Sequence, residues 1–321
     1  DASGNPIPDS RTFRDSKVAD WKETTGNIGV EYTPTENMMF YGRIAKGYRP
    51  GGFTGFGAQL GEAWDAEELV NYEGGIKGLF FDNTVQLEAS MYLQDFSAFW
   101  VQSGRRRTPA EIRPGESLFT GETVVIDGTE VFGIEIQGAW RINEAWTLRG
   151  FYEYSDSSLG SYETNYCCTP AGTTAAASTR DVTDDEGNVV SVIDTGIANF
   201  GGNSLRNVPK HKYSATLTWN TPLPAVYGYL DLATILSWRD IMYVDESNLD
   251  LYSVPEYTRW DLRANWASPN GTFRVTGWVS NMLDEVAVQA YSPREGNGVT
   301  GPISGTVTDE RRVGVTFSYQ L

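Results

Sequence analysis

The sequence predicts an all-β fold, a transmembrane antiparallel β-barrel, and three observations support this prediction. Segments of strand length divide into one apolar and one polar face, because side chains alternate across a strand. The connections between these segments alternate between short and long, as in outer-membrane barrels. No apolar run approaches the roughly 20 residues of a membrane-spanning helix, which excludes a helical membrane protein but not a barrel.

Eleven strands are expected, most of them about 10 to 16 residues long, whereas strands of soluble sheets usually have about 5 to 6 residues. The greater length suits a tilted crossing of a bilayer. The expected strands lie near residues 21–33, 37–48, 68–81, 84–101, 124–142, 145–156, 206–220, 228–243, 257–267, 272–282 and 310–321.

The first, second and eighth segments alternate least cleanly, and Asp231 in the eighth is expected near a strand end, where a charge costs less. The third segment sets an apolar group against a polar one: Val70, Tyr72, Ile76 and Phe80 against Asn71, Glu73 and Lys77. The fourth divides in the same way: Val85, Leu87, Ala89, Met91 and Leu93 against Gln86, Glu88, Ser90, Tyr92 and Gln94.

The fifth and ninth segments repeat the division of faces. The fifth opposes two sets, Phe132, Ile134, Ile136 and Trp140 against Glu135, Gln137 and Arg141. The ninth opposes Trp260, Leu262, Ala264 and Trp266 to Arg259, Asp261, Arg263 and Asn265. The chain stops on a segment of the same kind, with Val313, Val315, Phe317, Tyr319 and Leu321 against Arg312, Gly314, Thr316, Ser318 and Gln320.

The absence of charge from the apolar faces favours a membrane barrel over a soluble sandwich. At the edge of a sandwich face a stray charge is cheap, because water is close. On a lipid-facing position at mid-bilayer, Arg or Lys costs about 2–4 kcal/mol. The third, fourth, fifth and ninth apolar faces contain no charged residue, which is the pattern that lipid enforces.

The connections give an orientation. Five are short, namely 34–36, 82–83, 143–144, 221–227 and 268–271, and are expected on the periplasmic side. Five are long, namely 49–67, 102–123, 157–205, 244–256 and 283–309, and are expected outside the cell. Aromatic residues flank the short turns and predict an interfacial girdle: Phe80, Phe81, Trp140, Trp146, Trp219, Tyr229, Trp266 and Phe273.

The strand count bears on domain organisation. With short turns inside, the first strand starts outside the cell and the last ends in the periplasm. Complete single-chain bacterial barrels have an even number of strands, whereas eleven are expected here. Either one further strand is present in the sequence, or, as we expect, residues 1–321 form the C-terminal part of a larger barrel, with the N-terminal barrel half supplied by the same chain or a separate one.

Composition narrows the partners and sites. A net charge of −17 argues against nucleic acid, because phosphate binding needs a basic surface. Cys167 and Cys168 are too few and too close for a zinc site, and they form either a vicinal disulfide or a pair of free thiols. The acidic cluster at 184–188 fails the calcium-loop pattern and is expected to turn a small hairpin between 181–183 and 189–192. No metal site and no cofactor is expected.

Five motifs occur in an order that resembles TonB-dependent outer-membrane receptors. They are YGRIAKGYRPGGF at 41–53, NYEGGIKG at 71–78, VFGIE at 131–135, NVPKHK at 207–212 and VSNMLD at 279–284. The resemblance spans residues 31–321. It departs at the C-terminus, where the family usually ends on Phe or Trp and this chain ends on Leu321.

The resemblance implies a 22-stranded barrel with a plugged lumen, of which the eleven strands expected here are half. It further implies a location in the bacterial outer membrane, in contact with its lipid, and a plug domain and TonB box that nothing in this chain matches. The implied function is TonB-dependent active uptake of a scarce bulky solute. A ferric siderophore comes first, with haem, cobalamin or an oligosaccharide as alternatives, and the TonB energy-coupling complex is the implied partner.

Two groups of candidate site residues follow from their chemistry. Aromatic rings and guanidinium groups in the long loops suit an anionic chelate: Tyr48, Arg49, Phe53, Trp100, Arg105, Arg106 and Arg107. The plainer interpretation is a structural turn at 48–53 and a solvated loop tip at the arginines. Lumen-facing charges are expected to hydrate and hold a plug: Glu73, Lys77, Glu88, Glu135, Arg149, Glu153, Arg259, Asp261, Arg263 and Arg274.

Three other functions were weighed against uptake. A passive porin-like channel shares the strands and loops but needs an even strand count and no plug. A soluble β-rich adhesin or glycan-binding module would dissolve without detergent. An enzyme is not expected and no catalytic residue is proposed, because His211 lacks a Ser or Cys partner in a recognisable motif.

Overall fold

The computed structural model describes residues 17–54, 62–107, 119–165, 179–183, 189–194, 197–221, 223–292 and 304–320. Within these ranges the chain is built from strands and two short 3₁₀ turns, Ala225–Tyr227 and Asp250–Tyr252. None of the helical turns in the described ranges is long and apolar enough to span a membrane.

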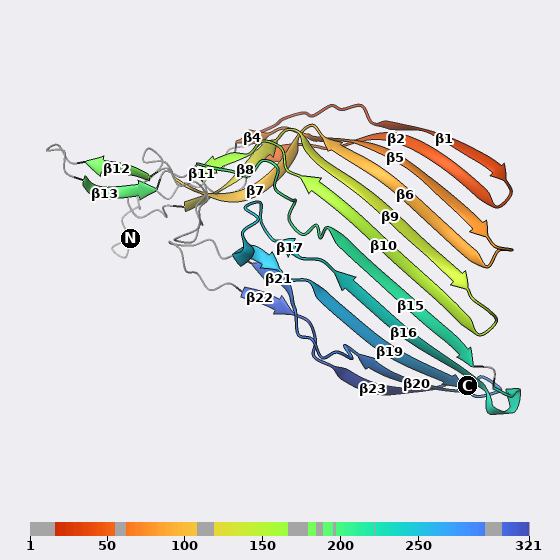
Figure 1. Ribbon diagram of the computed structural model, residues 1–321. Helices are drawn as coiled ribbons and strands as arrows, with labels where there is room; N and C mark the ends of the chain where they lie inside the picture. The colour runs from red at the N-terminus through yellow and green to blue at the C-terminus, as the bar shows by residue number, and fades with distance from the viewer. Residues whose placement is uncertain are drawn as a thin grey trace.

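One antiparallel sheet of eleven strands dominates the molecule, and its strand order follows the chain. Figure 1 shows it as a curved, twisted, open wall with β1 at one edge and β23 at the other. The strands are β1 (Gly26–Thr35), β2 (Met38–Arg49), β5 (Glu67–Phe80), β6 (Val85–Phe96), β9 (Thr129–Arg141), β10 (Trp146–Ser158), β15 (His211–Thr221), β16 (Tyr229–Arg239), β19 (Tyr257–Ala267), β20 (Phe273–Ser280) and β23 (Arg312–Tyr319).

All eleven expected strands are present, which confirms the predicted all-β antiparallel fold. Three expected strands are too long, and one of them, 228–243, ends in the structure at Arg239 of β16, with Met242–Tyr243 forming the separate strand β17. The segment 84–101 divides into β6 and β7 (Phe99–Arg106), and 124–142 divides between β8 (Phe119–Ile126) and β9. The break within 124–142 falls at Gly128, whose φ of +75° turns the backbone out of the extended conformation.

The register gives the sheet two chemically different faces. Ile44 lies opposite both Ile28 and Tyr72, and this apolar series continues across the strands. On the other side, Glu88 lies opposite Lys77 and Gln137. We call the first side the apolar face and the second the charged face. Each predicted apolar and polar set falls on its own face, because the pairing keeps the alternation in phase from strand to strand.

The apolar face is uncovered. Val30 is 70 % exposed, Met91 57 % and Phe317 77 %, and no second layer of described residues packs against them. A soluble sandwich would bury these side chains between two sheets about 10 Å apart. The exposed apolar surface is therefore typical of a wall that faces lipid and decides against a soluble sandwich.

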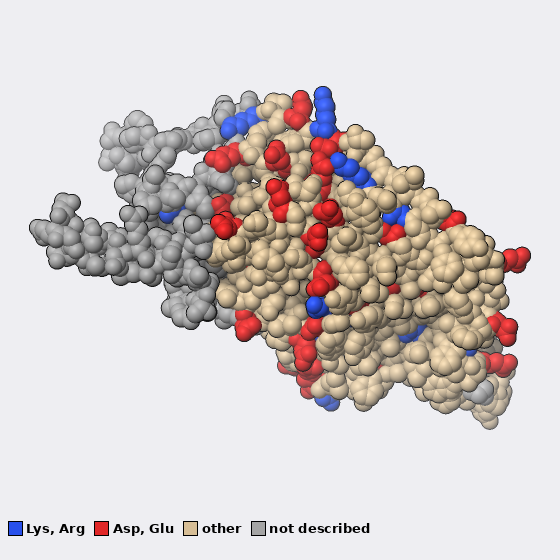
Figure 2. Space-filling view, turned by 45° about the horizontal axis from the view of Figure 1, so that its top comes forward, with Lys and Arg blue, Asp and Glu red and all other residues tan. Residues whose placement is uncertain are grey.

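Charges keep to the ends of the apolar face and to the charged face. Asp231 lies near the start of β16, as expected from the sequence. The register places it on the charged face beside Asn220 and Asn265, so it does not face lipid. Figure 2 shows acidic side chains gathered in a band that crosses the strands, while much of the surface between that band and the tight turns is uncharged.

The short connections form tight turns at one end of the sheet, at the right in Figure 1. Between β5 and β6, three consecutive residues, Phe81, Asp82 and Asn83, adopt positive φ angles of 52–62°. Aromatic rings meet near these turns. Trp146 stacks on Trp219, with 5.6 Å between ring centroids and 10° between ring planes. The predicted aromatic flank of the turns is thus assembled by cross-strand pairing.

The long connections build a second structure at the opposite end. They contain six two-stranded sheets, which include β3 (Gly52–Phe53) with β4 (Ala63–Trp64), and β7 with β8. The others pair β11 (Glu163–Asn165) with β14 (Ile197–Asn199), β12 (Thr179–Thr183) with β13 (Val189–Asp194), β17 (Met242–Tyr243) with β18 (Ser253–Val254), and β21 (Val288–Ser292) with β22 (Ser304–Val307).

The β12–β13 pair confirms the small hairpin expected from the sequence, whereas its turn, like Cys167 and Cys168, lies outside the described residues. The main hydrophobic core also lies at this end. Val101, Ile126, Leu159, Tyr162 and Phe200 are all buried together there. The long connections are therefore packed against one another in the described ranges.

Candidate functional site

Hydrogen bonds tie the charged face into a network near the middle of the sheet. Tyr41 Oη donates to Glu73 Oε1 at 2.7 Å, and Gln137 Nε2 donates to Glu88 Oε2 at 3.0 Å. Lys77 Nζ lies 3.5 Å from the same Glu88 oxygen. A pocket of about 220 Å³ opens among these side chains, and its lining is polar and acidic. Such a surface suits water or a polar polypeptide rather than hydrocarbon.

Bulky rings on the charged face lie over glycines. At Gly75 a Cβ atom would come within 2.6 Å of the Tyr41 ring, and at Gly133 within 2.1 Å of the Tyr92 ring. Each glycine therefore makes room for the aromatic ring of the neighbouring strand. This packing holds Tyr41 in place to donate its hydrogen bond to Glu73.

The other half of the charged face is rich in arginine. Arg259 Nε bonds both carboxylate oxygens of Asp261 at 3.0 Å, and Arg263 Nε donates to Asn265 Oδ1 at 3.1 Å. All ten residues predicted to face the lumen lie on this face by register, including the exposed Arg149 and Arg274 on β10 and β20. Their common placement is consistent with a polar lumen.

A cluster of aromatic rings with one arginine lies where β2 and β5 meet the long connections. The guanidinium carbon of Arg49 lies 3.9 Å from the centroid of the Trp100 ring. Arg49 Nη2 also donates to Glu67 Oε2 at 2.6 Å, and the Glu67 side chain is only 13 % exposed. The Trp100 backbone N–H donates to the same carboxylate oxygen at 3.3 Å. Glu67 thus fixes both the guanidinium and the strand that carries the indole.

Two further indoles extend this cluster, which we call the rim cluster: Trp21, Arg49, Phe53, Trp64, Glu67 and Trp100. Trp64 lies 6.1 Å from Trp100, and Trp21 meets Phe53 edge to face at the same separation. Gly52 lets Trp64 approach, because a Cβ there would lie 2.5 Å from the indole. The indole N–H groups of Trp64 and Trp100 are buried and have no acceptor among the described residues.

The rim cluster combines flat apolar rings with a guanidinium group. Rings of this kind contact planar or apolar parts of a solute, and a guanidinium group binds carboxylate and similar anionic oxygens. Because Glu67 already holds one edge of Arg49, the guanidinium presents a fixed direction instead of a mobile charge. The cluster is therefore a candidate contact surface for an anionic, partly aromatic solute.

Polar contacts join three long connections beyond the rim cluster. Arg206 Nε lies 3.0 Å from Glu246 Oε1, whose side chain is 6 % exposed, and Arg206 Nη2 donates to the Gln102 carbonyl at 3.4 Å. Asn203 Nδ2 donates to the Glu246 carbonyl at 2.8 Å. We call this set the loop latch. It connects three parts of the chain: strand β7, the segment that precedes β15, and the segment that follows β17.

The structure separates the residues predicted to bind solute. Arg49, Phe53 and Trp100 belong to the rim cluster, as described above. Tyr48 points to the apolar side, opposite Glu68 in the register, and does not join them. Arg105 and Arg106 belong to β7, but their side chains lie outside the described residues, and Arg107 follows the strand. The predicted group therefore does not form a single surface in the described part of the chain.

Sequence reasoning missed three members of the rim cluster, Trp21, Trp64 and Glu67. Glu67 had a usable signal, because it continues the alternation of Asn71 and Glu73 on the charged face. Trp21 precedes β1 and Trp64 belongs to the two-residue strand β4, so neither period 2 nor a motif applies to them. Only the folded loops bring them to the strands.

His211, the only histidine, lies at the start of β15 among aromatic rings. Its Nδ1 is 3.0 Å from Tyr152 Oη. Beside it, the hydrogen bond that Lys210 Nζ donates to Asp156 at 3.1 Å raises the pKa of the lysine. Among the described residues, no three His, Cys, Asp or Glu side chains are placed to hold a metal ion.

Comparison with known proteins identifies relatives of this chain. The sequence model of the family described as TonB dependent receptor-like, beta-barrel matches residues 3–282. The probable TonB-dependent siderophore receptor PiuA of Acinetobacter baumannii is 26 % identical over 249 residues, or 75 % of this chain and 28 % of PiuA. The metal-pseudopaline receptor CntO of Pseudomonas aeruginosa is 25 % identical over 289 residues, or 89 % of this chain and 33 % of CntO.

Solved structures share the fold. The ferric yersiniabactin uptake receptor FyuA from Yersinia pestis superposes with a TM-score of 0.61 at 16 % identity, covering 91 % of this chain and 36 % of FyuA. The crystal structure of PiuA gives a TM-score of 0.60 at 21 % identity, with 91 % and 35 % coverage. The chain thus spans about a third of the length of the relatives it matches.

Proposed function

The chain belongs to the TonB dependent receptor-like β-barrel family, and we propose that it takes part in TonB-dependent uptake of a ferric siderophore across the bacterial outer membrane. The observation that carries the proposal is the two-faced sheet of eleven strands, apolar on one side and charged on the other. Relatives that are named as siderophore and metal-chelate receptors support this class of solute.

In the proposed arrangement the apolar face contacts lipid and the long connections lie outside the cell. The rim cluster then stands at the mouth of the lumen, where an incoming chelate first meets the barrel wall. Arg49 would bind anionic oxygens of the chelate, and the Trp64 and Trp100 rings would contact its apolar parts. Haem, cobalamin or an oligosaccharide remain alternatives within the same mode of uptake.

The charged face is proposed to hold a plug domain, and the TonB energy-coupling complex to drive its rearrangement. Lys212 Nζ pairs with Glu153 at 2.7 Å, which shows that some charges on this wall are already satisfied within the sheet. The exposed Arg149, Arg263 and Arg274 are the wall charges best placed to meet acidic groups of a plug. Replacing these three together should weaken uptake, and unchanged uptake would remove them from that role.

Uptake by cells tests the function directly. In the bacterium that encodes the protein, iron-limited cells would be supplied with radioactive iron on siderophores of several chemical classes. Deleting the gene should abolish accumulation of at least one chelate, and so should collapse of the proton-motive force, because the proposed uptake is energised. Accumulation that survives collapse of the proton-motive force would instead indicate a passive porin-like channel.

Paired variants test the rim cluster within the same assay. Trp100→Ala removes a ring that contacts Arg49, and a lost stacking contact worth about 1.4 kcal/mol lowers chelate affinity about tenfold. Tyr48→Ala is the matched control, because Tyr48 is an aromatic residue that directly precedes Arg49 in the sequence but points to the apolar face. Equal loss in both variants would contradict the assignment of the rim cluster.

A further inference from the structure

Several glycines leave hollows in the surface of the sheet, and aromatic rings of the chain cover some of these hollows. On the charged face, aromatic rings of the chain itself cover the hollows: Tyr41 lies over Gly75, Tyr92 over Gly133 and Trp278 over Gly314. On the apolar face, no ring of the chain covers Gly42 or Gly74 in the described structure. The hollow above Gly42 and Gly74 is therefore open, unlike that above Gly78 on the same face, which the Phe80 ring covers.

Gly42 and Gly74 lie directly opposite each other on β2 and β5. An added Cβ at Gly42 would have Val30 Cγ1 as its nearest contact at 3.9 Å, and one at Gly74 would have the Tyr41 carbonyl oxygen at 3.7 Å. Both are ordinary van der Waals separations, so the space above the two glycines is free. Two adjacent residues without side chains therefore form the floor of a depression.

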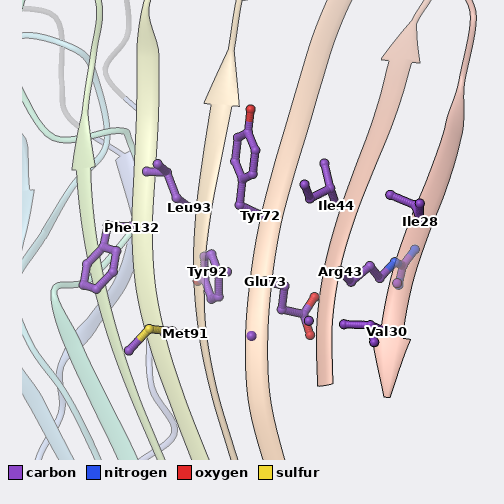
Figure 3. Close-up of a pocket in the computed structure, with 13 residues that line it drawn as sticks. Ile28, Val30, Arg43, Ile44, Tyr72, Glu73, Met91, Tyr92, Leu93 and Phe132 are labelled. Carbon is purple, nitrogen blue, oxygen red and sulfur yellow. The ribbon is translucent and has the colours of Figure 1, made fainter. Parts of the chain in front are cut away.

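The depression is a groove of about 640 Å³ that crosses five neighbouring strands, from β1 to β9. Figure 3 shows the apolar side chains around it, which include Ile28, Tyr72, Met91 and Phe132. Several side chains that line the groove are strongly exposed, and Ile28 has an exposed fraction of 73 %. Four strand spacings of about 4.8 Å make the groove about 19 Å wide across the sheet.

The position of the groove places it at the depth of hydrocarbon. Ile44 borders the groove, and two residues further along β2, toward the long connections, Lys46 on the same side pairs with Glu68 at 2.6 Å. Charges on this face therefore begin just beyond the groove. The groove lies inside the uncharged belt, near its edge on the side of the long connections.

We propose that the groove binds one acyl chain of an outer-membrane lipid and retains it as an ordered lipid. Hydrocarbon is the occupant because the walls are apolar, the groove is continuous with the lipid-facing surface, and water gains few hydrogen bonds there. The proposal rests on the membrane placement of the family and not on uptake, so either can fail without the other.

The test compares lipid retention in three forms of the full protein. Wild type, the double variant Gly42→Leu with Gly74→Leu, and the control Gly150→Leu would be reconstituted into vesicles of phosphatidylethanolamine and phosphatidylglycerol. They would then be extracted in mild detergent and weighed by native mass spectrometry. Gly150 is a matched control because it faces the apolar side with room for a Cβ, 3.7 Å from its nearest contact, outside the groove.

Wild type and the Gly150→Leu control should carry one lipid, and the double variant should carry it about tenfold less often, the factor that corresponds to roughly 1.4 kcal/mol of lost apolar contact. Gel mobility with and without heating checks that each barrel is folded, and the single variants replace the double one if it does not fold. Equal retention in all forms overturns the proposal. So does a wild-type dimer that the two leucines dissociate, because a second copy then fills the groove.

Discussion

Adjacent glycines on β5 show how much one methyl group can matter on either face. Gly75→Ala would place a Cβ 2.6 Å from both the Tyr41 ring and the Ala89 carbonyl oxygen, so the backbone must shift. We expect a loss of about 1–3 kcal/mol in the free energy of unfolding, as for other overpacked sites. Urea unfolding of the refolded barrel in detergent measures it.

The neighbouring glycine supplies the control for this measurement. Gly74→Ala adds the same methyl group on the apolar face, where its nearest contact is 3.7 Å away. Its unfolding free energy should stay within about 0.5 kcal/mol of the wild type. Equal destabilisation at both positions would mean that strand flexibility, and not the Tyr41 ring, sets the requirement for glycine.

Single residues also mark where prediction from sequence ends. The face of each strand residue was predictable, because period-2 alternation decides it once the strand is known. The partners of Arg49 were harder to predict, because Glu67 on β5 and Trp100 on β7 are 18 and 51 positions away in the sequence. The place of Asp231 near a strand end was predictable, but its face was not, because in a weakly alternating strand only pairing with β15 and β19 fixes the phase.

At the scale of elements, each strand of the main sheet must keep charge off its apolar face. Met91 on β6 is 57 % exposed on the face that we assign to lipid. Met91→Arg would place a guanidinium group among the apolar side chains of that face. Mid-bilayer arginine costs about 2–4 kcal/mol, which should appear in the unfolding free energy of the protein in vesicles. Ser90→Arg is the control, because Ser90 is its neighbour on the charged face beside Glu135.

The loop latch gives a prediction for the long connections. Arg206→Ala removes the ion pair with Glu246, whose carboxylate is nearly buried, and should raise amide hydrogen exchange around residues 197–210 and 244–254. Exchange in β15 and β19 should not change. The control is Lys210→Ala, which breaks the ion pair between Lys210 and Asp156. Both side chains of this pair are more than half exposed, so the pair contributes little to stability. Equal exchange in both variants would contradict the latch.

The small sheets of the long connections were the least predictable elements. Their strands are only two to eight residues long, which is too short for sustained alternation to mark them in the sequence. The β12–β13 hairpin was the exception, since a cluster of turn-forming residues separates its strands. Motif order, on the other hand, identified the family without any of these details.

At the scale of the whole molecule, the direction of the edge strands constrains barrel closure. With eleven strands in antiparallel order, β1 and β23 both run from the long connections toward the tight turns. A second copy rotated about the barrel axis would bring β23 beside β1 in parallel. Antiparallel closure therefore needs strands that run the opposite way at both edges, which agrees with a chain that spans about a third of its relatives.

The central claim is that the apolar face contacts lipid while the charged face contacts water, and a cysteine scan along β6 tests it most directly. Cys167 and Cys168 would first be replaced by serine. Single cysteines at Gln86 to Leu93 would then be exposed in vesicles to a lipid-confined thiol reagent and to a water-soluble thiol reagent. Positions 87, 89, 91 and 93 should respond to the lipid reagent, and positions 86, 88, 90 and 92 to the aqueous one. Uniform reaction with the aqueous reagent along the strand would contradict the claim.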